Sequence, residues 1–343
     1  MRADITVTMA TPADRPDWER FVSSRGDEAG YHAFDWQEVF SRAFGHESVY
    51  LIARRGGEVT GVLPIVQIKS LLFGRTLTSL PFLNYGGVLA DSDDTAHALV
   101  EASLREARAR RCGHVELRHV AAQFPELPSK QHKVSMRLPL GPGLWDRLDR
   151  KVRNQIRKAE KSGLTVERGG AELVGDFYSV FARNMRDLGT PVYSRRLFDE
   201  VLRVFPERTT MHVVRLDGRP VAAGVTYRTA KMTQLPWASS IRDYNTLCPN
   251  TLLYWDAIQY AADAHCEVFD MGRSTPHEGT FKFKQQWGAS PVQLHWEYQL
   301  QAEHDLPNVS PANPKFHLAI ALWQKLPLAI TRHVGPMIVR AIP

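Results

Sequence analysis

The chain has 343 residues, of which 43% are hydrophobic and 23% are charged, a composition typical of globular proteins and unlike that of disordered or fibrous chains. Its net charge of +6 permits an anionic partner such as nucleic acid, a phosphorylated substrate or an anionic membrane surface, and identifies none of them. The three cysteines form no metal-type or CxxC pair, no uninterrupted apolar run reaches membrane-spanning length, and the N-terminus lacks the apolar core of a signal peptide. We therefore expect a cytoplasmic protein with reduced thiols.

The first 120 residues alternate between strand and helix patterns. Alternating apolar residues predict a strand at Ile5–Met9 and a β-hairpin with strands at Val49–Ala53 and Val59–Ile68. The other expected elements are helices from Asp14 to Phe21 and within Tyr31–Phe44, an apolar loop or strand at Pro81–Leu89, a helix at about Asp94–Arg111, and a strand at His114–Val120. This mixture predicts an α/β fold.

The same order of elements returns about 155 to 160 residues later. The expected members are helices at Glu172–Leu188 and within Pro191–Phe205, a hairpin of Met211–Leu216 and Val221–Thr229, a strand at Lys231–Ser239, a helix at Asn250–Ala264, and a closing strand at Glu267–Met271. The pattern predicts a duplicated α/β half, and a cleft between two like halves is a natural ligand site.

A basic amphipathic helix is expected between the halves, at Asp146–Gly163. Its apolar positions recur at three- and four-residue steps (Leu148, Val152, Ile156, Ala159), and Gly163 is a plausible stop. Arg147 to Lys161 contains seven Lys or Arg and two acids, with Arg153, Arg157 and Lys161 spaced four apart on one stripe. The stripe is either a solvated surface or a face toward phosphate or nucleic acid, since unneutralised like charges at this spacing repel.

The segment Glu267–Gly288 reads E-V-F-D-M-G-R-S-T-P-H-E-G-T-F-K-F-K-Q-Q-W-G. After the closing strand and a turn-rich loop, the run F-K-F-K alternates, which predicts a strand with Phe281 and Phe283 on one face and Lys282 and Lys284 on the other. Lysines interleaved with aromatics can hold an anion beside an apolar wall. The alternative is an edge strand whose lysines only prevent pairing.

The C-terminal tail is apolar but interrupted by Gln324, Lys325, Pro327 and Pro336, so it is too broken to span a bilayer. It either docks on the body of the protein or lies in a membrane interface with Lys325, Arg332 and Arg340 near headgroups.

Three features together resemble the FemAB family: the helix K-V-R-N-Q-I-R-K-A-E-K-S-G-L, the block G-R-S-T-P-H-E-G-T-F-K-F-K-Q-Q-W-G-A, and the duplicated half. The resemblance extends from Thr6 to about Leu300. Within the family, the sequence pattern is most similar to the FemAB-like branch associated with exopolysaccharide and PEP-CTERM gene clusters. It implies two tandem GNAT-like (acyl-CoA N-acyltransferase fold) domains packed around a central cleft. We expect the first over residues 1–145, the second over 146–300 beginning with the basic helix, and an amphipathic tail over 301–343.

The resemblance also implies the chemistry. FemAB proteins transfer an aminoacyl group from aminoacyl-tRNA to an amine of a cell-wall precursor, whereas related GNAT branches use a thioester such as acetyl-CoA; neither donor is a tightly bound cofactor. In this fold donor and acceptor meet where the central sheet splays, and a thioester's pyrophosphate usually sits on a Gly-rich helix N-terminus. The chain lacks an Arg/Gln-x-x-Gly-x-Gly/Ala signature, Asn250-Thr251 being the nearest candidate, and also lacks the long coiled-coil arm with which some relatives approach tRNA.

The resemblance to the FemAB family also implies roles for individual lysine and arginine residues in the transfer reaction. Lys284 first and Lys282 second would stand near the reacting carbonyl or the acceptor's diphosphate and stabilise developing negative charge. Arg273 would grip phosphate or carboxylate, or else pair with Asp270 or Glu278. Arg153 and Arg157 would contact the donor's nucleic acid, a nucleotide or a phosphate.

His277 and Glu278 are the first candidates for the base that deprotonates an attacking amine, and Asp270 is a further candidate. The structural alternative is that His277 and Glu278 are only exposed loop residues and that Asp270 caps or pairs locally. Tyr85 and Trp237 occupy corresponding segments of the two halves and would line the cleft or belong to the core. No metal-ligand cluster, Ser-His-Asp order or Walker-type loop occurs.

We therefore expect an acyltransferase that moves an aminoacyl or acyl group onto an amine or hydroxyl of a peptidoglycan or exopolysaccharide precursor. The alternatives are a non-catalytic GNAT-like binding or scaffold protein of the exopolysaccharide machinery, and a tRNA- or RNA-binding module that the basic helix alone supports. Expected partners are the envelope saccharide or peptide precursor, tRNA, and the inner membrane through the tail.

Overall fold

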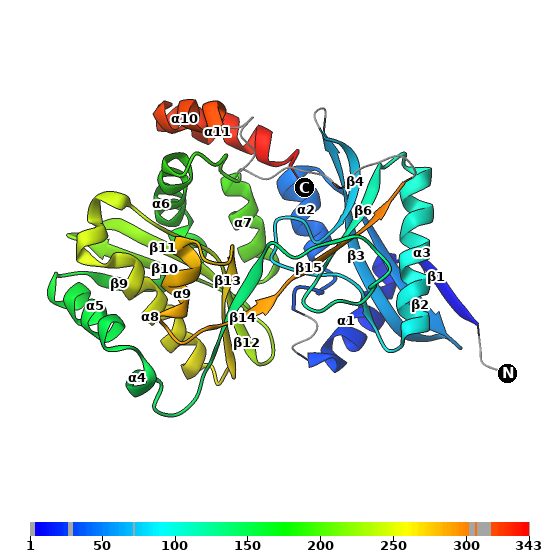
Figure 1. Ribbon diagram of the computed structural model, residues 1–343, viewed down its shortest axis with the longest axis horizontal. Coiled ribbons are helices and arrows are strands. Elements are labelled where there is room, and N and C mark those ends of the chain that lie inside the picture. Colours follow the sequence, from blue (N-terminus) through cyan, green and yellow to red (C-terminus); the bar gives the residue numbers. More distant parts are fainter. Residues whose placement is uncertain (1–3, 27–29, 71–72, 302–305, 307–316, 343) are drawn as a thin grey trace. The chain divides into compact units, whose positions relative to one another are not determined.

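The computed structural model describes residues 4–26, 30–70, 73–301, 306 and 317–342 of the chain, which divides into two compact units (Figure 1). Unit 1 comprises residues 1–133, 293–308 and 340–343, and unit 2 comprises residues 134–292 and 309–339. The division falls after Lys133 and not at the expected residue 145, because the strand Val134–Pro139 pairs within the second sheet.

Unit 1 is built on a mixed sheet with the strand order β1-β2-β3-β4-β6-β15-β7, and β5 pairs beside β3. The strands are β1 (Ile5–Met9), β2 (Glu47–Arg55), β3 (Glu58–Ser70), β4 (Gly74–Ser79), β5 (Leu89–Ala90), β6 (His114–His119), β7 (Ser129–Lys130) and β15 (His295–Leu300). The helices are α1 (Arg15–Ser24), α2 (Trp36–Phe44) and α3 (Asp93–Ala109). Strands β4 and β6 are parallel, and α3 lies on the connection between them (Figure 1).

The sequence explains the limits of α3. Ser92 caps its first turn by accepting a hydrogen bond from the Thr95 amide, and two aspartates follow where the helix dipole favours them. Leu99 and Val100 are buried in the core between α3 and the sheet. The predicted helix and the strand after it are confirmed, but β4 was not predicted: its segment G-R-T-L-T-S has a single bulky apolar residue.

Unit 2 has a second mixed sheet with the order β14-β8-β13-β12-β11-β10-β9. The strands are β8 (Val134–Pro139), β9 (Thr165–Gly169), β10 (Thr209–Leu216), β11 (Arg219–Arg228), β12 (Met232–Ser240), β13 (Val268–Ser274) and β14 (Ser290–Gln293). The helices are α4 (Leu144–Arg147), α5 (Arg150–Lys161), α6 (Val174–Asp187), α7 (Arg195–Val204), α8 (Pro249–Asp263), α9 (Gly279–Gln285), α10 (His317–Lys325) and α11 (Leu328–Val339).

The duplicated order is confirmed. The series α1-α2-β2-β3-β4-α3-β6 in unit 1 repeats as α6-α7-β10-β11-β12-α8-β13 in unit 2, and each series ends in a parallel pair, β4–β6 or β12–β13. The two sheets are completed by exchanged segments: β8 follows unit 1 in the chain but pairs with β13, and β15 follows unit 2 but pairs with β6. Both exchanged strands are antiparallel to the strands they join.

The basic helix is shorter than expected. It begins at Arg150, where the Asp149 side chain accepts the Lys151 amide at 2.6 Å, and Leu148 has extended backbone that separates it from the single turn α4. The predicted apolar stripe is confirmed, since Leu148, Val152, Ile156 and Ala159 are all buried. Gly163 lies just beyond the helix in the left-handed region (φ 78°), as expected for a glycine stop.

Candidate functional site

Strands β12 and β13 separate partway along their length. Their pairing covers three residue pairs, from Met232↔Val268 to Gln234↔Asp270. Beyond these, β12 continues to Ser240, whereas β13 continues to Ser274 and pairs on its other side with β8. A parallel sheet that opens at the carboxyl ends of its strands is a place where ligands bind in α/β folds.

Asp270 lies at the last rung of this pairing and is completely buried. Its Oδ1 accepts the Ser135 hydroxyl at 2.6 Å and the Gly272 amide at 2.8 Å, and its Oδ2 lies 3.6 Å from Nε of Arg137 on β8. The register between β13 and β8 shifts between Asp270 and Arg273, where Gly272 has a φ of 79°. The carboxylate therefore anchors a β-bulge, which agrees with the structural alternative for Asp270 better than with a general base.

Lys284 reaches the bulge from α9. Its side chain is 5% exposed, and Nζ donates hydrogen bonds to the carbonyl oxygens of Gly272 and Arg273, both at 2.9 Å. Burial lowers the pKa of Lys284 to about 8, against the opposing attraction of Asp270. An ammonium group has three N–H donors, so one remains for an acceptor outside these two bonds.

The run F-K-F-K is a helix and not a strand, so the prediction that Lys282 and Lys284 share a face is wrong. Residues two apart on a helix point about 200° from each other, and Lys282 is accordingly exposed while Lys284 is buried. The aromatics hold the helix in place: Phe281 and Trp287 are buried, and the Phe283 ring lies 5.1 Å from that of Tyr254 on α8. Packing against α8 and β13 outweighs the local alternation.

Gln234, on β12, is the polar residue that the sequence reasoning missed. It is fully buried, lies opposite Asp270, and neither its amide nitrogen nor its amide oxygen has a hydrogen-bond partner among the described residues. A buried amide without partners costs about 1–3 kcal/mol. Such a group at the separation of β12 and β13 is suited to bind an amide or carbonyl of a ligand. No local sequence signal marked it, because Q-L-P-W resembles any half-buried strand.

The loop candidates lie between β13 and α9. His277 is exposed and has a φ of 68°, and its ring is 5.9 Å from that of Phe281. Glu278 is exposed and precedes α9 without capping it through its side chain. Arg273 is half-buried and follows the bulge directly. These three residues border the segment that carries Lys284.

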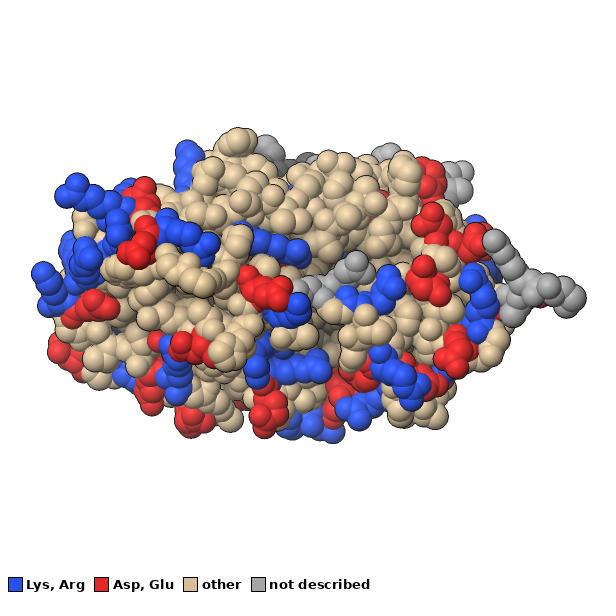
Figure 2. Space-filling view, turned by 90° about the horizontal axis from the view of Figure 1, so that it is seen from below, with Lys and Arg blue, Asp and Glu red and all other residues tan. Residues whose placement is uncertain are grey.

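The arginines of the basic helix differ in their surroundings. Arg157 lies over the Trp145 ring, with its guanidinium carbon 5.4 Å from the ring centre, whereas Arg153 is half-buried. The expected stripe through Arg153 is therefore only partly exposed. Figure 2 shows Lys and Arg side chains gathered in the region of α4 and α5.

Tyr85 and Trp237 are core residues. Tyr85 is 1% exposed and its ring lies 5.4 Å from that of Tyr31, and Trp237 is 4% exposed with its ring edge-on to Phe198 at 5.3 Å. Their burial matches the core alternative and leaves little surface for lining a cleft.

The described residues contain no group of His, Cys, Asp or Glu placed to hold a metal ion. In the part of the chain that the structure covers, none of the helices combines the length and apolar character needed to cross a bilayer.

Comparisons with known proteins agree with this architecture. Residues 147–285, which lie in the second unit, match the family model of the acetyltransferase (GNAT) domain. FemX has a TM-score of 0.65 at 14% identity, over 85% of this chain and 96% of its own. A tandem GNAT protein of the clavulanic acid pathway has a TM-score of 0.56 at 12% identity, over 88% of this chain and 100% of its own.

A third similar structure is the C-terminal domain of a putative lysylphosphatidylglycerol synthetase from Agrobacterium fabrum, with a TM-score of 0.56 at 13% identity over 83% of this chain and 91% of that one. No curated protein matches the chain. At these identities the structural likeness establishes the fold, two tandem GNAT-like units.

Proposed function

We propose that the chain is an acyltransferase whose reaction takes place where β12 and β13 separate in unit 2. The observation that carries the proposal is the buried ammonium of Lys284, held at the bulge of β13 within the GNAT domain. A fixed positive charge in a water-poor site stabilises the negative charge that develops on a carbonyl oxygen during acyl transfer. The unpartnered amide of Gln234 supplies a second polar group at the same place.

In the proposed reaction, an amine or hydroxyl of the acceptor attacks the carbonyl carbon of the donor. The new C–N or C–O bond forms, the bond to the donor's sulfur or ester oxygen breaks, and the proton of the nucleophile leaves to solvent or a loop side chain. His277 and Glu278 are exposed near this segment and remain the candidates to accept that proton. An amine attacking an activated ester needs little assistance from a base.

The donor is an acyl thioester or an aminoacyl-tRNA. For a thioester, the N-terminus of α8 follows β12 in the position that the fold uses for pyrophosphate, but here it begins at Cys248-Pro249 without glycine. For aminoacyl-tRNA, the basic surface of α5 with Arg153 and Arg157 supplies the contact.

The acceptor in this proposal is a precursor of the cell envelope. The names of two similar structures, FemX and lysylphosphatidylglycerol synthetase, together with the FemAB resemblance of the sequence, support this class of acceptor. The exopolysaccharide branch is the more specific form of the proposal.

The test is a transfer assay with acyl-CoAs and aminoacyl-tRNAs supplied separately, in which lipid-linked peptide and saccharide precursors are examined for a mass increment. We expect Lys284→Met to lower kcat at least about 100-fold, the size seen when one oxyanion donor is removed. Lys282→Met, two residues away on the same helix but exposed, is the matched control and should retain activity.

Tight binding of a precursor with no transfer from any donor would instead indicate a non-catalytic scaffold. Equal loss of activity in both lysine variants would contradict the role given to Lys284.

A further inference from the structure

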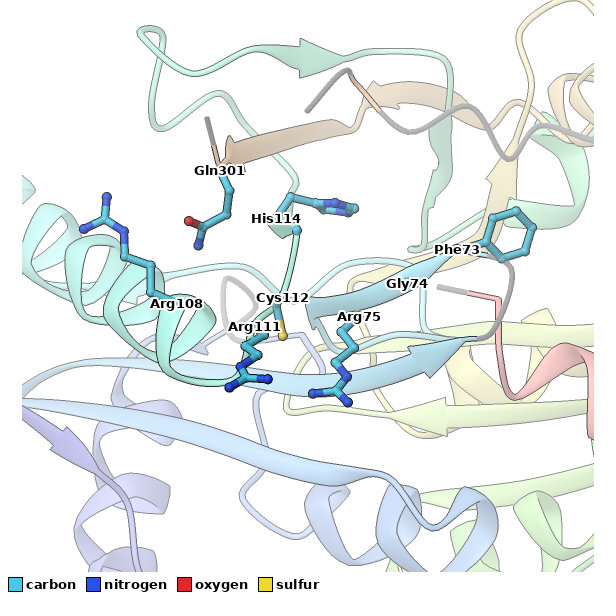
Figure 3. Close-up of a pocket in the computed structure, with 9 residues that line it drawn as sticks. Phe73, Gly74, Arg75, Arg108, Arg111, Cys112, His114 and Gln301 are labelled. Carbon is cyan, nitrogen blue, oxygen red and sulfur yellow. The ribbon is translucent and has the colours of Figure 1, made fainter. Parts of the chain in front are cut away.

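Unit 1 contains an arginine-lined cavity that the proposed transfer reaction does not use. It has a volume of about 430 Å³, within the range of small-molecule sites. Its lining includes Arg75 at the start of β4, Arg108 near the end of α3, Arg111 in the turn after α3, and Gln301 just after β15 (Figure 3). We call these four residues and the space between them the arginine pocket.

Among the residues that the structure describes, no acidic side chain neutralises the charge of the arginine pocket. No described acidic residue lines the cavity, and Arg75, Arg108 and Arg111 make no ion pair with any other described residue. The neighbouring Arg110 shows the contrast, because it pairs with both Glu47 and Glu106. The three arginines are exposed and line one cavity, so an anion bound there would be attracted by their like charges and would stabilise the unit.

Backbone contacts hold the arginines together. The Gly113 amide donates to the Arg75 carbonyl at 2.8 Å, which joins the start of β4 to the turn that carries Arg111. Figure 3 shows Arg75 and Arg111 extending in the same direction from these joined segments, with Arg108 on α3 and Gln301 on the other side of the turn. Arg75 and Arg111 therefore lie together at one side of the cavity lining, and Arg108 and Gln301 lie at the other.

Gln301 contributes an independent observation. Its side-chain Nε2 is buried and donates to no described residue, although its backbone amide bonds to the Gly113 carbonyl at 3.0 Å. Its amide is thus a buried donor that lines the same cavity as the three arginines and has no acceptor among the described residues.

The position of Arg111 is costly for a residue other than glycine. It has a φ of 55°, and the Cys112 amide bonds back to the Ala107 carbonyl at 2.8 Å, an arrangement in which glycine is usual after a helix. Unit 2 has the same turn after α8, where His265 has a φ of 56° and the Cys266 amide bonds to Ala261 at 3.0 Å. The left-handed turn after the helix therefore occurs in both units, whereas an arginine at this position that lines a cavity occurs in unit 1.

The ordinary explanation for basic residues at a helix end is the helix dipole. It applies to Arg108 but not to Arg75, which lies on a strand. The dipole supplies about half a negative charge at the C-terminus of α3, against three positive charges in the cavity. Among the described residues, the net charge that lines the cavity is therefore positive.

We infer that the arginine pocket binds a phosphate-bearing small molecule. Guanidinium groups bind phosphate oxygens in a bidentate manner, and the Gln301 amide adds a neutral donor. Cys112 is a neutral part of the wall, since burial raises the pKa of its thiol. The inference is independent of the transfer reaction, because the cavity is lined by unit 1 whereas Lys284 belongs to unit 2.

The test is calorimetric titration of the full chain with pyrophosphate, ADP and inorganic phosphate at low ionic strength. We expect saturable binding that weakens with salt, and at least a tenfold weaker affinity in Arg75→Ala and in Arg111→Gly. Arg111→Gly should at the same time raise the Tm by about 2–4 °C, because glycine removes the left-handed strain. If ADP binds more tightly than pyrophosphate and inorganic phosphate, the natural ligand is a phosphate ester. If the three probes bind with equal affinity, the ligand is a free phosphate.

Two matched variants complete the test. His265→Gly makes the same backbone change in unit 2 and should raise the Tm without altering affinity. Arg105→Ala removes an exposed guanidinium from α3 outside the cavity and should leave affinity unchanged. The inference is overturned if none of the three probes binds, or if Arg111→Gly binds as tightly as the unaltered protein.

Discussion

At the scale of single residues, the most informative group is the ammonium of Lys284. Its two carbonyl acceptors belong to the bulge that Asp270 anchors, so one buried cation and one buried anion both hold the same turn of β13. Burying a charge is costly unless it is hydrogen-bonded, and here each charge has such partners. The arrangement holds the ammonium in a fixed position at the bulge.

The lowered pKa of Lys284 predicts a specific dependence of stability on pH. The pKa of Lys284 is about 8 in the folded chain and the ordinary value of a lysine side chain is 10.5, so between these values the unfolded chain binds more protons than the folded one. The free energy of unfolding therefore gains a contribution as pH rises through this window, about 2 kcal/mol between pH about 7.5 and about 9.5. Urea unfolding at both pH values measures it.

Lys284→Met should lack that increment, whereas the exposed Lys282→Met should retain it; other titrating groups are common to all three proteins and cancel in the comparison. An identical pH dependence in the two variants would show that Lys284 titrates normally.

Sequence reasoning located Lys284 but misjudged its surroundings. It identified the residue from the F-K-F-K block, yet the side-chain direction depended on a helix that local alternation did not reveal. Gln234 and Ser135 escaped notice because their significance arises from pairing across β12, β13 and β8, segments far apart in the chain. Long-range register is not contained in a local pattern.

At the scale of elements, the strongly periodic segments were predicted well. The two hairpins, the helices α3, α6 and α8, and the duplicated order are confirmed, because each has a regular apolar spacing or a clear turn. The second hairpin turns through Asp217 and Gly218, both with positive φ, as tight hairpin turns require. Two short strands were missed: β4 has a single bulky apolar residue, whereas β8 does alternate Val134, Met136 and Leu138 and was overlooked because it is short and follows a loop.

The tail helices α10 and α11 dock on unit 2 by one face and expose another. Thr331 and Gly335 are buried, and the Gln324 side chain donates to the Asp187 carbonyl at the end of α6 at 3.1 Å. The outward side carries Leu318, 72% exposed, and Met337, 65% exposed. From residue 306 onward the chain contains no Asp or Glu and four cations, Lys315, Lys325, Arg332 and Arg340.

This face predicts binding to anionic membranes. We expect the chain to cosediment with phosphatidylglycerol vesicles more strongly than with phosphatidylcholine vesicles, because apolar burial and charge act together. Replacing Leu318 and Leu322 with serine should reduce the bound fraction severalfold. Met9→Ser, which changes an exposed apolar residue of unit 1, should not. Equal binding to both kinds of vesicle would contradict the charge contribution.

At the scale of the whole molecule, each sheet depends on a strand from beyond its own continuous stretch of chain. In unit 1, buried polar groups connect β15 to the rest of the sheet. The Val88 amide donates to Nε2 of His119, and Nδ1 of that ring lies 2.6 Å from Glu297 on β15. Although burial opposes it, hydrogen bonds from His119 and from the Phe124 and Gln123 amides hold the pKa of Glu297 below its ordinary value. Without β15, His119 and two amides lose their acceptor.

Residues 1–133 alone should therefore fail to fold cooperatively. A protein in which a flexible linker joins residues 293–301 to residue 133 should regain a cooperative thermal transition, measurable by circular dichroism, because β6 recovers its neighbour. The same fusion with Glu297→Gln should unfold at a lower temperature, since a buried charged acceptor is lost. A cooperative transition in residues 1–133 alone would show that β15 is dispensable.

The late arrival of β15 has a consequence for synthesis on the ribosome. Unit 1 begins to emerge first, yet its sheet lacks a strand until residue 300 has been made, by which time nearly all of the second sheet has been translated. At about 5–20 residues per second, the open side of β6 waits on the order of ten to thirty seconds for its partner. Unit 2 would then complete its sheet before unit 1, although unit 1 is translated first. The nascent N-terminal half would therefore be the part that most needs a chaperone.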